Sequence, residues 1–215
     1  MISGEHIHFF GFRYLFLKMI RMEHISLNFG NKSIFKDLNI QIKKGEKVSI
    51  SGESGRGKTS LLKLILGFVL PDSGEIFVNG SVLSSKSANQ LRKDIAWVPQ
   101  NINLPVKTGK ELMQLLNIDE KKEQIANYLD GLGLDAGIIG KDFTKISGGQ
   151  KQRLVISIIL GLDKSIILMD EPTASLDEKS IKLLLNVIDS MEGKTIISAS
   201  HHQGWNDHSD KVIAI

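Results

Sequence analysis

The segment GESGRGKT, which occupies residues 52–59, has the residue types and spacing of a phosphate-binding loop. It fits the pattern GxxxxGK[ST], in which glycines let backbone amides wrap a phosphate, lysine neutralises the phosphate oxygens and the hydroxyl ligates Mg²⁺. An ordinary glycine-rich turn is the alternative. A phosphate loop lies between a strand and a helix, and the sequence predicts both, at residues 47–51 and 58–66. A plain turn would need neither. The sequence therefore predicts a phosphate loop in which Lys58 and Thr59 carry the chemistry.

Two adjacent acids, Asp170 and Glu171, follow the apolar run at residues 165–169. A buried strand that ends in this way places its carboxylates at the carboxyl edge of a parallel sheet, where ligands of open α/β folds bind. We expect Asp170 to hold Mg²⁺, directly or through water, and Glu171 to polarise a water that attacks a γ-phosphate. Taken alone, the pattern is more typical of a strand that leaves the core. Together with a phosphate loop it predicts a nucleotide-hydrolysing site.

A third candidate segment, residues 147–150, comes directly before a helical stretch at residues 150–160. A hydroxyl and free amides at the positive end of a helix can bind an anion, although a simple helix cap explains them equally well. With Ile146 the segment reads ISGGQ, which resembles the LSGGQ signature of ABC ATPases, and residues 151–153 read KQR as in that family. On the order of its three motifs, the chain is identified as a member of the ABC ATPases.

The resemblance extends from about residue 22 to residue 215 and implies further site residues. Phe29 matches the aromatic residue that stacks on adenine, for which the family usually has tyrosine, and a core position is the alternative. Gln100 matches the glutamine that senses Mg²⁺ and the lytic water where the core meets the helical lobe.

The end of the strand expected at residues 195–199 implies a further catalytic residue. Ser200 and His201 resemble the switch that contacts the γ-phosphate, and we prefer His201 to its neighbour His202, which we assign to the surface. Residues 174–177 resemble the D-loop at the dimer interface, where Asp177 could also cap a helix. The chain departs from the family pattern at Ile146, at Glu53 and Arg56 inside the loop, and at His202, where an acid is common. None of these changes removes a group that takes part in the chemistry.

The expected sites can be stated residue by residue. Catalysis is assigned to Lys58, Gln100, Glu171 and His201, and Mg²⁺ binding to Thr59, Gln100 and Asp170. ATP binding is assigned to Phe29, Gly52, Glu53, Ser54, Gly55, Arg56, Gly57, Lys58, Thr59, Ser60, Ser147, Gly148, Gly149 and Gln150.

Hydrophobic periodicity predicts an α/β fold that positions these residues. Apolar residues alternate from residue 23 and again at residues 38–42, which indicates an antiparallel β subdomain. Helical spacing over residues 108–142 predicts an inserted helical lobe, whose bounds we place at about residues 101–160. Beyond the lobe, strands and helices alternate in a way that is typical of a mostly parallel sheet with helices on both faces. The expected strands are residues 95–98, 165–169, 195–199 and 212–215, and the expected helix between them is residues 177–191.

Composition limits the alternatives. The chain has 215 residues, 41% of them hydrophobic and 24% charged, a formal net charge of +3 and no cysteine. These values favour a globular domain and exclude disulfides and thiolate metal sites, while the lack of a concentrated basic face argues against a nucleic-acid partner. The apolar run at residues 7–20 contains Arg13 and Lys18 and is shorter than a membrane span. We treat residues 1–21 as an extension that is a non-native start, a docking element or a surface anchor, and residues 22–215 as the ATP-binding domain.

The resemblance implies an ATP-binding and hydrolysing subunit of an ABC transporter, with ATP and Mg²⁺ as cofactors. Two such domains, expected to form a homodimer in the ATP-bound state, would pair head to tail. A separate polytopic membrane subunit would be the partner at the inner, cytoplasmic face of the cell membrane. A soluble ABC ATPase that drives complex assembly, for example in iron–sulfur cluster biogenesis, is the alternative. A small-molecule kinase would leave the signature and His201 without a role.

Overall fold

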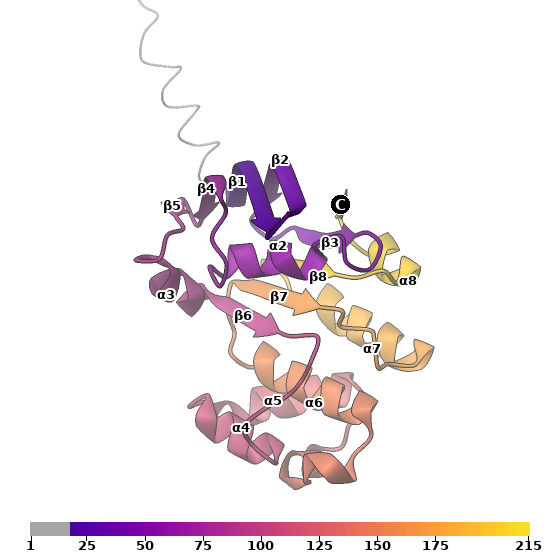
Figure 1. Ribbon diagram of the computed structural model, residues 1–215. Helices are drawn as coiled ribbons and strands as arrows, with labels where there is room; N and C mark the ends of the chain where they lie inside the picture. Colours follow the sequence, from indigo (N-terminus) through magenta and orange to yellow (C-terminus); the bar gives the residue numbers. More distant parts are fainter. Residues whose placement is uncertain (1–17) are drawn as a thin grey trace, which may run out of the picture.

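Alternating apolar residues at the start of the described chain form an antiparallel sheet. The computed structural model describes residues 18–215, and Figure 1 shows their arrangement. The sheet has four strands in the order β2-β1-β4-β5. Their bounds are β1 (Lys18–Phe29), β2 (Lys32–Lys43), β4 (Ser73–Val78) and β5 (Ser81–Val82).

The short apolar runs expected to be buried form a five-stranded sheet in the order β6-β7-β8-β3-β9. The bounds are β3 (Lys47–Ser51), β6 (Ile95–Val98), β7 (Ile166–Asp170), β8 (Thr195–Ala199) and β9 (Lys211–Ala214). Neighbouring strands pair in parallel, so their carboxyl ends share one edge. The residues that follow β3, β6, β7 and β8 therefore meet there.

The helices fill the connections between these strands. Their bounds are α2 (Lys58–Ile65), α3 (Ala88–Leu91), α4 (Gly109–Leu115), α5 (Lys122–Gly131), α6 (Gly148–Leu160), α7 (Glu178–Asp189) and α8 (Gln203–Asp207). Short 3-10 helices lie at Arg92–Asp94, Asp119–Lys121, Ala136–Gly140 and Phe143–Lys145. The sequence did not predict α3 or α8, because so short an element carries no apolar period.

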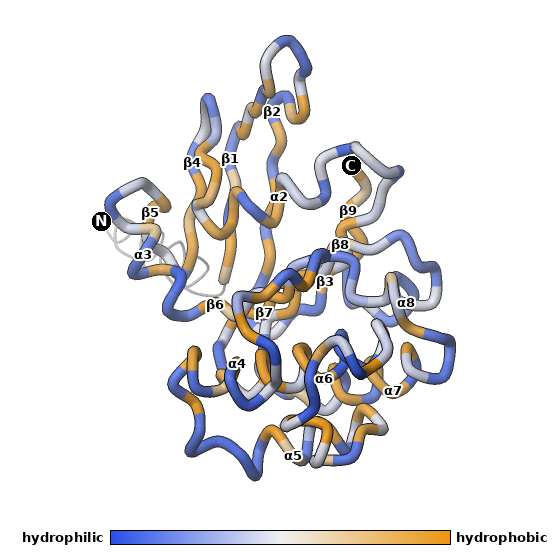
Figure 2. The backbone as a smooth tube through the Cα atoms, turned by 60° about the horizontal axis from the view of Figure 1, so that its bottom comes forward, coloured by the Kyte–Doolittle hydropathy of each residue, from blue (hydrophilic) through white to orange (hydrophobic). Residues whose placement is uncertain are grey.

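The parallel sheet separates two apolar cores, and strand β7 contributes to both. Ile167 and Met169 pack in the cluster that includes residues of α4, α5, α6 and α7. Ile166 and Leu168 point the other way, into the cluster formed with α2 and the antiparallel sheet. Figure 2 shows the apolar strands at the centre and hydrophilic connections around them. The α/β fold class is confirmed, with one refinement: the antiparallel sheet shares one face of the parallel sheet with α2.

Helices α4, α5 and α6 form the expected helical lobe, seen at the bottom of Figure 1. Thr108 caps α4 by accepting a hydrogen bond from the amide of Glu111. A β-bridge between Thr108 and Asp142 closes the base of the lobe. No helix among residues 18–215 is both long and apolar enough to cross a bilayer.

Strand β1 begins earlier than the sequence predicted. The expected boundary between residues 21 and 22 falls inside the strand, in which Ile20 pairs with Ile42 on one side and Val78 on the other. Arg21 hid this segment from the pattern, since its charge interrupts the apolar run. Its guanidinium lies 3.9 Å from the centroid of the Phe77 ring and so remains at the surface of the sheet. The β subdomain therefore includes residues 18–21, and residues 1–17 lie outside the described part.

Deleting residues 1–21 should destabilise the protein, whereas deleting residues 1–17 leaves β1 intact and is the matched control. Ile20 is 0% exposed and Met19 is 6% exposed, so the longer deletion removes two core side chains. Because each such loss costs roughly 2–5 kcal/mol, we expect the melting temperature to fall by about 10 °C or more relative to the shorter deletion. Differential scanning calorimetry measures this difference. Equal melting temperatures would show that the start of β1 is not part of the core.

Candidate active site

The phosphate loop joins the end of β3 to the start of α2. Gly57 caps α2 with a φ of 107°, a conformation that side chains rarely adopt, and a Cβ there would come 2.6 Å from Ile34. A Cβ at Gly52 would come 2.4 Å from the carbonyl oxygen of Ile215. These two positions therefore require glycine for reasons of packing and backbone conformation, in addition to the close approach of a phosphate.

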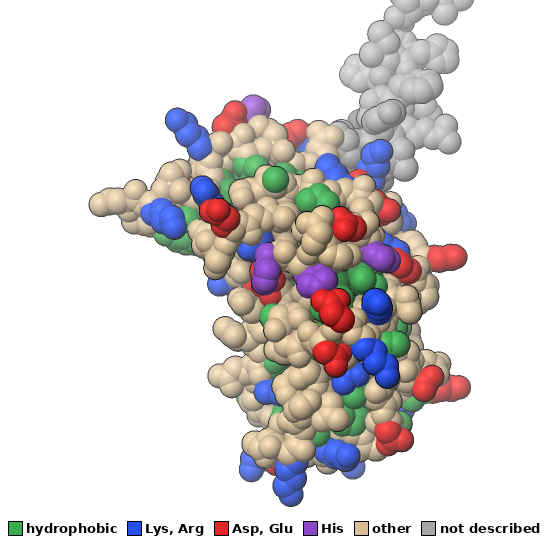
Figure 3. All heavy atoms as spheres, turned by 90° about the vertical axis from the view of Figure 1, so that its right-hand side faces the viewer, with side chains coloured by type: hydrophobic (Ala, Val, Ile, Leu, Met, Phe, Trp, Pro, Cys, Tyr) green, Lys and Arg blue, Asp and Glu red, His purple; other side chains and the backbone are tan. Residues whose placement is uncertain are grey.

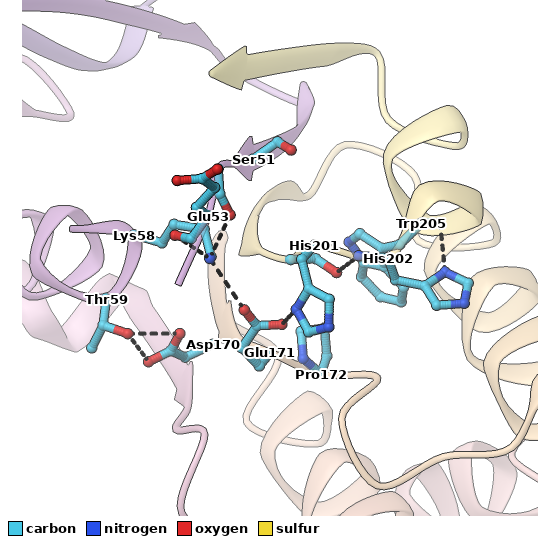
Figure 4. A network of polar contacts seen from close by, with 12 residues as sticks. Ser51, Glu53, Lys58, Thr59, Asp170, Glu171, Pro172, His201, His202 and Trp205 are labelled. Atoms are coloured by element: carbon cyan, nitrogen blue, oxygen red, sulfur yellow. Dashed lines mark hydrogen bonds and ion pairs between the residues drawn. The ribbon is translucent and has the colours of Figure 1, made fainter. Parts of the chain in front are cut away.

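Lys58 points back into the loop that precedes it (Figure 4). Its Nζ donates to the carbonyl oxygens of Gly52, at 2.8 Å, and Glu53, at 3.2 Å. The residue is only 7% exposed, so its charge is held inside the loop. A phosphate that entered the loop would meet this ammonium group and the loop amides together.

Thr59 and Asp170 bring a hydroxyl and a carboxylate together at the first turn of α2. The Thr59 hydroxyl donates to the two carboxylate oxygens at 3.1 and 2.8 Å. Burial raises the pKa of Asp170, and the nearby Glu171 carboxylate adds to this shift, while the bond from Thr59 opposes it. Hard oxygen ligands of this kind, one or two per site with substrate phosphates completing the shell, are what Mg²⁺ prefers. The pair therefore fits a Mg²⁺ site.

Glu171 is held in a strained conformation that turns its carboxylate toward Lys58. Its φ is 48°, in the left-handed region that few non-glycine residues adopt, and its amide donates to the carbonyl oxygen of Ala199 at 2.9 Å. Its Oε1 lies 3.6 Å from the Lys58 Nζ, and its Oε2 lies 2.9 Å from the His201 Nδ1 (Figure 4). Only 8% of the residue is exposed. A strained residue persists only where the surrounding structure holds it in place, and such residues are concentrated at functional sites.

The two adjacent histidines point in different directions. His201 reaches Glu171, whereas the Nδ1 of His202 accepts a hydrogen bond from the amide of Trp205 and so caps α8. The Nε2 of His202 lies 3.3 Å from a Glu178 carboxylate oxygen. Figure 3 shows histidine and acidic side chains next to one another on this face. The sequence assigned His202 to the surface without predicting its structural role as a cap.

An open hollow of about 190 Å³ lies over the phosphate loop. Its lining includes Lys58, Thr59, Gln100 and Glu171, so the structure brings together residues from three separate segments. Ile34 also lines it and was missed from the sequence. One feature of the sequence points to this position. Side chains alternate between the two faces of a strand, so Ile34 should face the opposite way from its neighbour Phe35, which packs into the core.

Other expected binding residues lie apart from this hollow. Phe29 is 50% exposed at the end of β1 and, within the described chain, is not part of the lining. Glu53 and Arg56 form an exposed ion pair at 3.3 Å. The four residues 147–150 also lie outside the lining, at the start of α6.

The signature segment, residues 147–150, begins α6 with a capping box. The Ser147 hydroxyl accepts from the amide of Gln150 at 3.1 Å, and the Gln150 side chain accepts from the amide of Ser147 at 3.0 Å. A Cβ at Gly149 would come 2.8 Å from the Ser175 carbonyl oxygen, so the signature segment packs closely on residues 174–177. The predicted helix cap at Asp177 is confirmed.

Replacing Asp170 by Asn should stabilise the protein in the absence of nucleotide and metal. A carboxyl whose folded-state pKa is raised binds more protons when folded, so between the unfolded and folded pKa values stability falls as pH rises. At pH 7 the buried charge is therefore a cost, and relieving roughly 1 kcal/mol of it raises the melting temperature by about 2–4 °C. Thermal denaturation in EDTA at pH 7 measures the shift. A lower melting temperature in Asp170→Asn would show that the carboxylate stabilises the fold.

Comparison with known proteins shows which family the chain resembles. The family described as ABC transporter matches residues 35–174. The glutamine transport ATP-binding protein GlnQ of Bacillus subtilis (strain 168) is 31% identical over 210 residues, which cover 92% of this chain and 86% of that protein. The ATP-dependent permease MDL1 of Candida albicans is 34% identical over 194 residues, which cover 84% of this chain and 28% of that protein.

A solved structure described as the dimeric structure of MJ0796, a bacterial ABC transporter cassette, superposes with a TM-score of 0.83. It is 27% identical, and the superposition covers 92% of this chain and 94% of that one. The fold and the family expected from the signature segment are thereby confirmed. The chain belongs to the ABC transporter family.

Proposed function

We propose that this chain binds and hydrolyses ATP as a subunit of an ABC transporter and couples hydrolysis to transport through a separate membrane-spanning partner. The observation that carries the proposal is the hollow over the phosphate loop. Its lining combines a lysine ammonium group, a hydroxyl and a buried carboxylate, from Lys58, Thr59 and Glu171. Phosphoryl transfer depends on positioning and electrostatics, and these groups supply both.

ATP would bind with its phosphates on the amides of residues 52–60 and its base toward β1 and β2. Phe29 offers an exposed ring for stacking, and Ile34 offers apolar surface at the edge of the hollow. Lys58 would exchange its two loop carbonyls for phosphate oxygens. Thr59, Gln100 and Asp170 would hold Mg²⁺, which would neutralise charge on the phosphates.

Glu171 would orient and deprotonate the attacking water. Its carboxylate is fixed between Lys58 and His201, which leaves it few orientations. Fixing a general base in this way lowers the cost of aligning it with the water. His201 contacts Glu171, and its side chain is 70% exposed. It would therefore also be free to contact the terminal phosphate.

The signature segment would serve the nucleotide of a second copy. It presents the amino end of α6 but stands away from the hollow of its own chain. A head-to-tail homodimer would place it against the partner's ATP, and the solved structure of MJ0796 is described as dimeric. Each site would then be completed by two chains, so one chain alone would bind ATP without efficient hydrolysis.

Replacing Ser147 by Arg should abolish hydrolysis while leaving ATP binding to a single chain within about twofold of wild type. The arginine would occupy the position of the partner's phosphate, and losing the cap costs only about 1 kcal/mol. Ser147→Thr keeps the capping hydroxyl and is the matched control. ATPase assays together with titration of a fluorescent nucleotide measure the two properties. Parallel loss of binding and hydrolysis would contradict the composite site.

The relatives reported above are named as transport proteins, which supports a transporter subunit over an assembly factor. We place the ATP-binding domain at residues 18–215 instead of 22–215, with a helical lobe at about residues 101–160. We propose a polytopic membrane partner and no nucleic acid, and a position at the cytoplasmic face of the membrane.

Two measurements test the function: an ATPase assay of the purified chain, and purification of the chain from membranes to identify proteins bound to it. We expect ATPase activity that requires Mg²⁺, together with co-purification of a polytopic protein from detergent-solubilised membranes. A folded chain that binds no ATP would reject the ATPase. Activity with no membrane subunit in the complex would favour the assembly factor.

A further inference from the structure

Three consecutive side chains in the first half of α6 donate hydrogen bonds to the backbone of three separate segments. The Lys151 Nζ donates to the carbonyl oxygen of Ile102 at 2.8 Å. The Gln152 Nε2 donates to the carbonyl oxygen of Pro172 at 2.7 Å, and the Arg153 Nη1 donates to that of Leu132, also at 2.7 Å. The helix that begins with the signature segment is thus tied to the segments that follow β6, β7 and α5.

The bond from Lys151 reaches the backbone two residues after Gln100. Residues 100–106 contain neither helix nor strand. Within the part of the chain that the structure describes, Lys151 makes the one hydrogen bond that joins residues 100–106 to another element. Its ammonium group is also 5.3 Å from the centroid of the Phe143 ring.

Packing alone leaves this segment with little constraint along its length. Ile102, Leu104 and Val106 are partly buried against the core of the lobe, an apolar contact without direction. A hydrogen bond from a charged donor to a carbonyl is directional and about twice as strong as a neutral one. Lys151 therefore fixes where the chain runs immediately after Gln100.

We propose that Lys151 is a positioning residue, which acts through Ile102 to hold Gln100 at the metal side of the hollow and links that position to the signature segment. The inference rests on the proposed function, in which Gln100 acts at the site of its own chain and Ser147 at that of the partner. Lys151 lies one residue after Gln150, so a movement of the amino end of α6 moves its ammonium group. The partner's nucleotide would in this way influence the glutamine at the other site.

Gln152 makes a second link from the same turn. Its Nε2 also lies 3.4 Å from the carbonyl oxygen of Glu171, so α6 is joined to the backbone beside the proposed base. Gln152 is only 6% exposed, and replacing it would remove the side-chain donor to the buried Pro172 carbonyl oxygen and destabilise the fold. Lys151 is only partly buried, which makes it the better residue to change.

The test replaces Lys151 by Met, which keeps the length and apolar stem of the side chain and removes the donor. We expect kcat to fall about tenfold, in line with the loss of one charged hydrogen bond, while the melting temperature changes little. Lys151→Arg retains a charged donor and should recover most of the activity. Lys110→Met removes an exposed charge from α4 of the same lobe and should leave kcat at the wild-type value.

A double-mutant cycle with Gln100→Ala separates positioning from general weakening. If Lys151 acts through Gln100, the double variant is no slower than Gln100→Ala alone, since the second change removes nothing further. Binding of Mn²⁺ in the presence of a non-hydrolysable ATP analogue, followed by electron paramagnetic resonance, gives a readout without hydrolysis. In this measurement, Lys151→Met should weaken Mn²⁺ binding when it is made in the wild-type chain. It should have no further effect when it is made in the Gln100→Ala variant.

Additive effects in the cycle, or a Lys151→Met variant with wild-type kcat and Mn²⁺ binding, would overturn the inference and leave the proposed function standing. An inactive wild-type chain in the same assay would instead reject the proposed function, so the two failures are distinguishable. A large fall in the melting temperature of Lys151→Met, with no recovery in Lys151→Arg, would assign the residue a structural role only and also overturn the inference.

Discussion

Glu171→Gln should bind ATP, fail to hydrolyse it and form a stable dimer. A positioned general base contributes about 10²–10⁴-fold to such reactions, so we expect kcat to fall by that factor. ATP binding should persist, because the loop amides, the Lys58 ammonium group and the residues expected to hold Mg²⁺ all remain when Glu171 is replaced. Glutamine also retains an oxygen that can accept from His201, so the change in packing is small. The uncleaved nucleotide would contact both chains only in the paired arrangement, so it should stabilise the dimer.

Size-exclusion chromatography with light scattering measures this effect. We expect Glu171→Gln to be a monomer with Mg-ADP and a dimer with Mg-ATP. Adding Ser147→Arg to the same chain should return it to a monomer, since the phosphate would then meet an arginine in place of the signature hydroxyl. Hydrolysis at the wild-type rate in Glu171→Gln would remove this carboxylate from catalysis.

Lys58→Ala should lose hydrolysis by about 10³-fold or more, because it removes the buried ammonium group that we propose to face the transferred phosphate. Binding should weaken as well, since the same group would neutralise the ground-state phosphates. Circular dichroism would check the fold, because the change also leaves the Glu171 carboxylate without its ion-pair partner.

Lys63→Ala makes the same change on the exposed side of the same helix and is the matched control. We expect it to keep wild-type activity to within about twofold, as surface substitutions away from a site usually do. Activity close to wild type in a folded Lys58→Ala variant would contradict the assignment of the phosphate loop.

Much of the fold was predictable because the motifs depend on local sequence. The strands β3, β6 and β8 agree with the expected bounds, since each is a short apolar run closed by polar or turn residues. The start of β1 could not be predicted in this way, because charged residues flank its buried Met19 and Ile20. Helix α8 was missed because so short an element carries no apolar period and because the burial of Trp205 depends on tertiary packing.

The site shows the same division between local and long-range information. The phosphate loop and the Asp170–Glu171 pair were visible in the sequence as patterns of neighbouring residues. The inclusion of Ile34 in the hollow was not, because it depends on how β2 packs on Gly57. The strained backbone of Glu171 was equally hidden, since it follows from a hydrogen bond to Ala199 on a neighbouring strand. The link from Lys151 to Ile102 joins residues 49 positions apart.

The most direct test of the composite site is a structure of the Glu171→Gln variant bound to Mg-ATP. We predict a symmetric dimer in which each nucleotide lies on the phosphate loop of one copy, with its terminal phosphate within hydrogen-bond distance of Lys58. The same phosphate should accept a hydrogen bond from the Ser147 hydroxyl of the second copy. A nucleotide held by one chain alone, with the signature segment of every other copy away from it, would contradict the account.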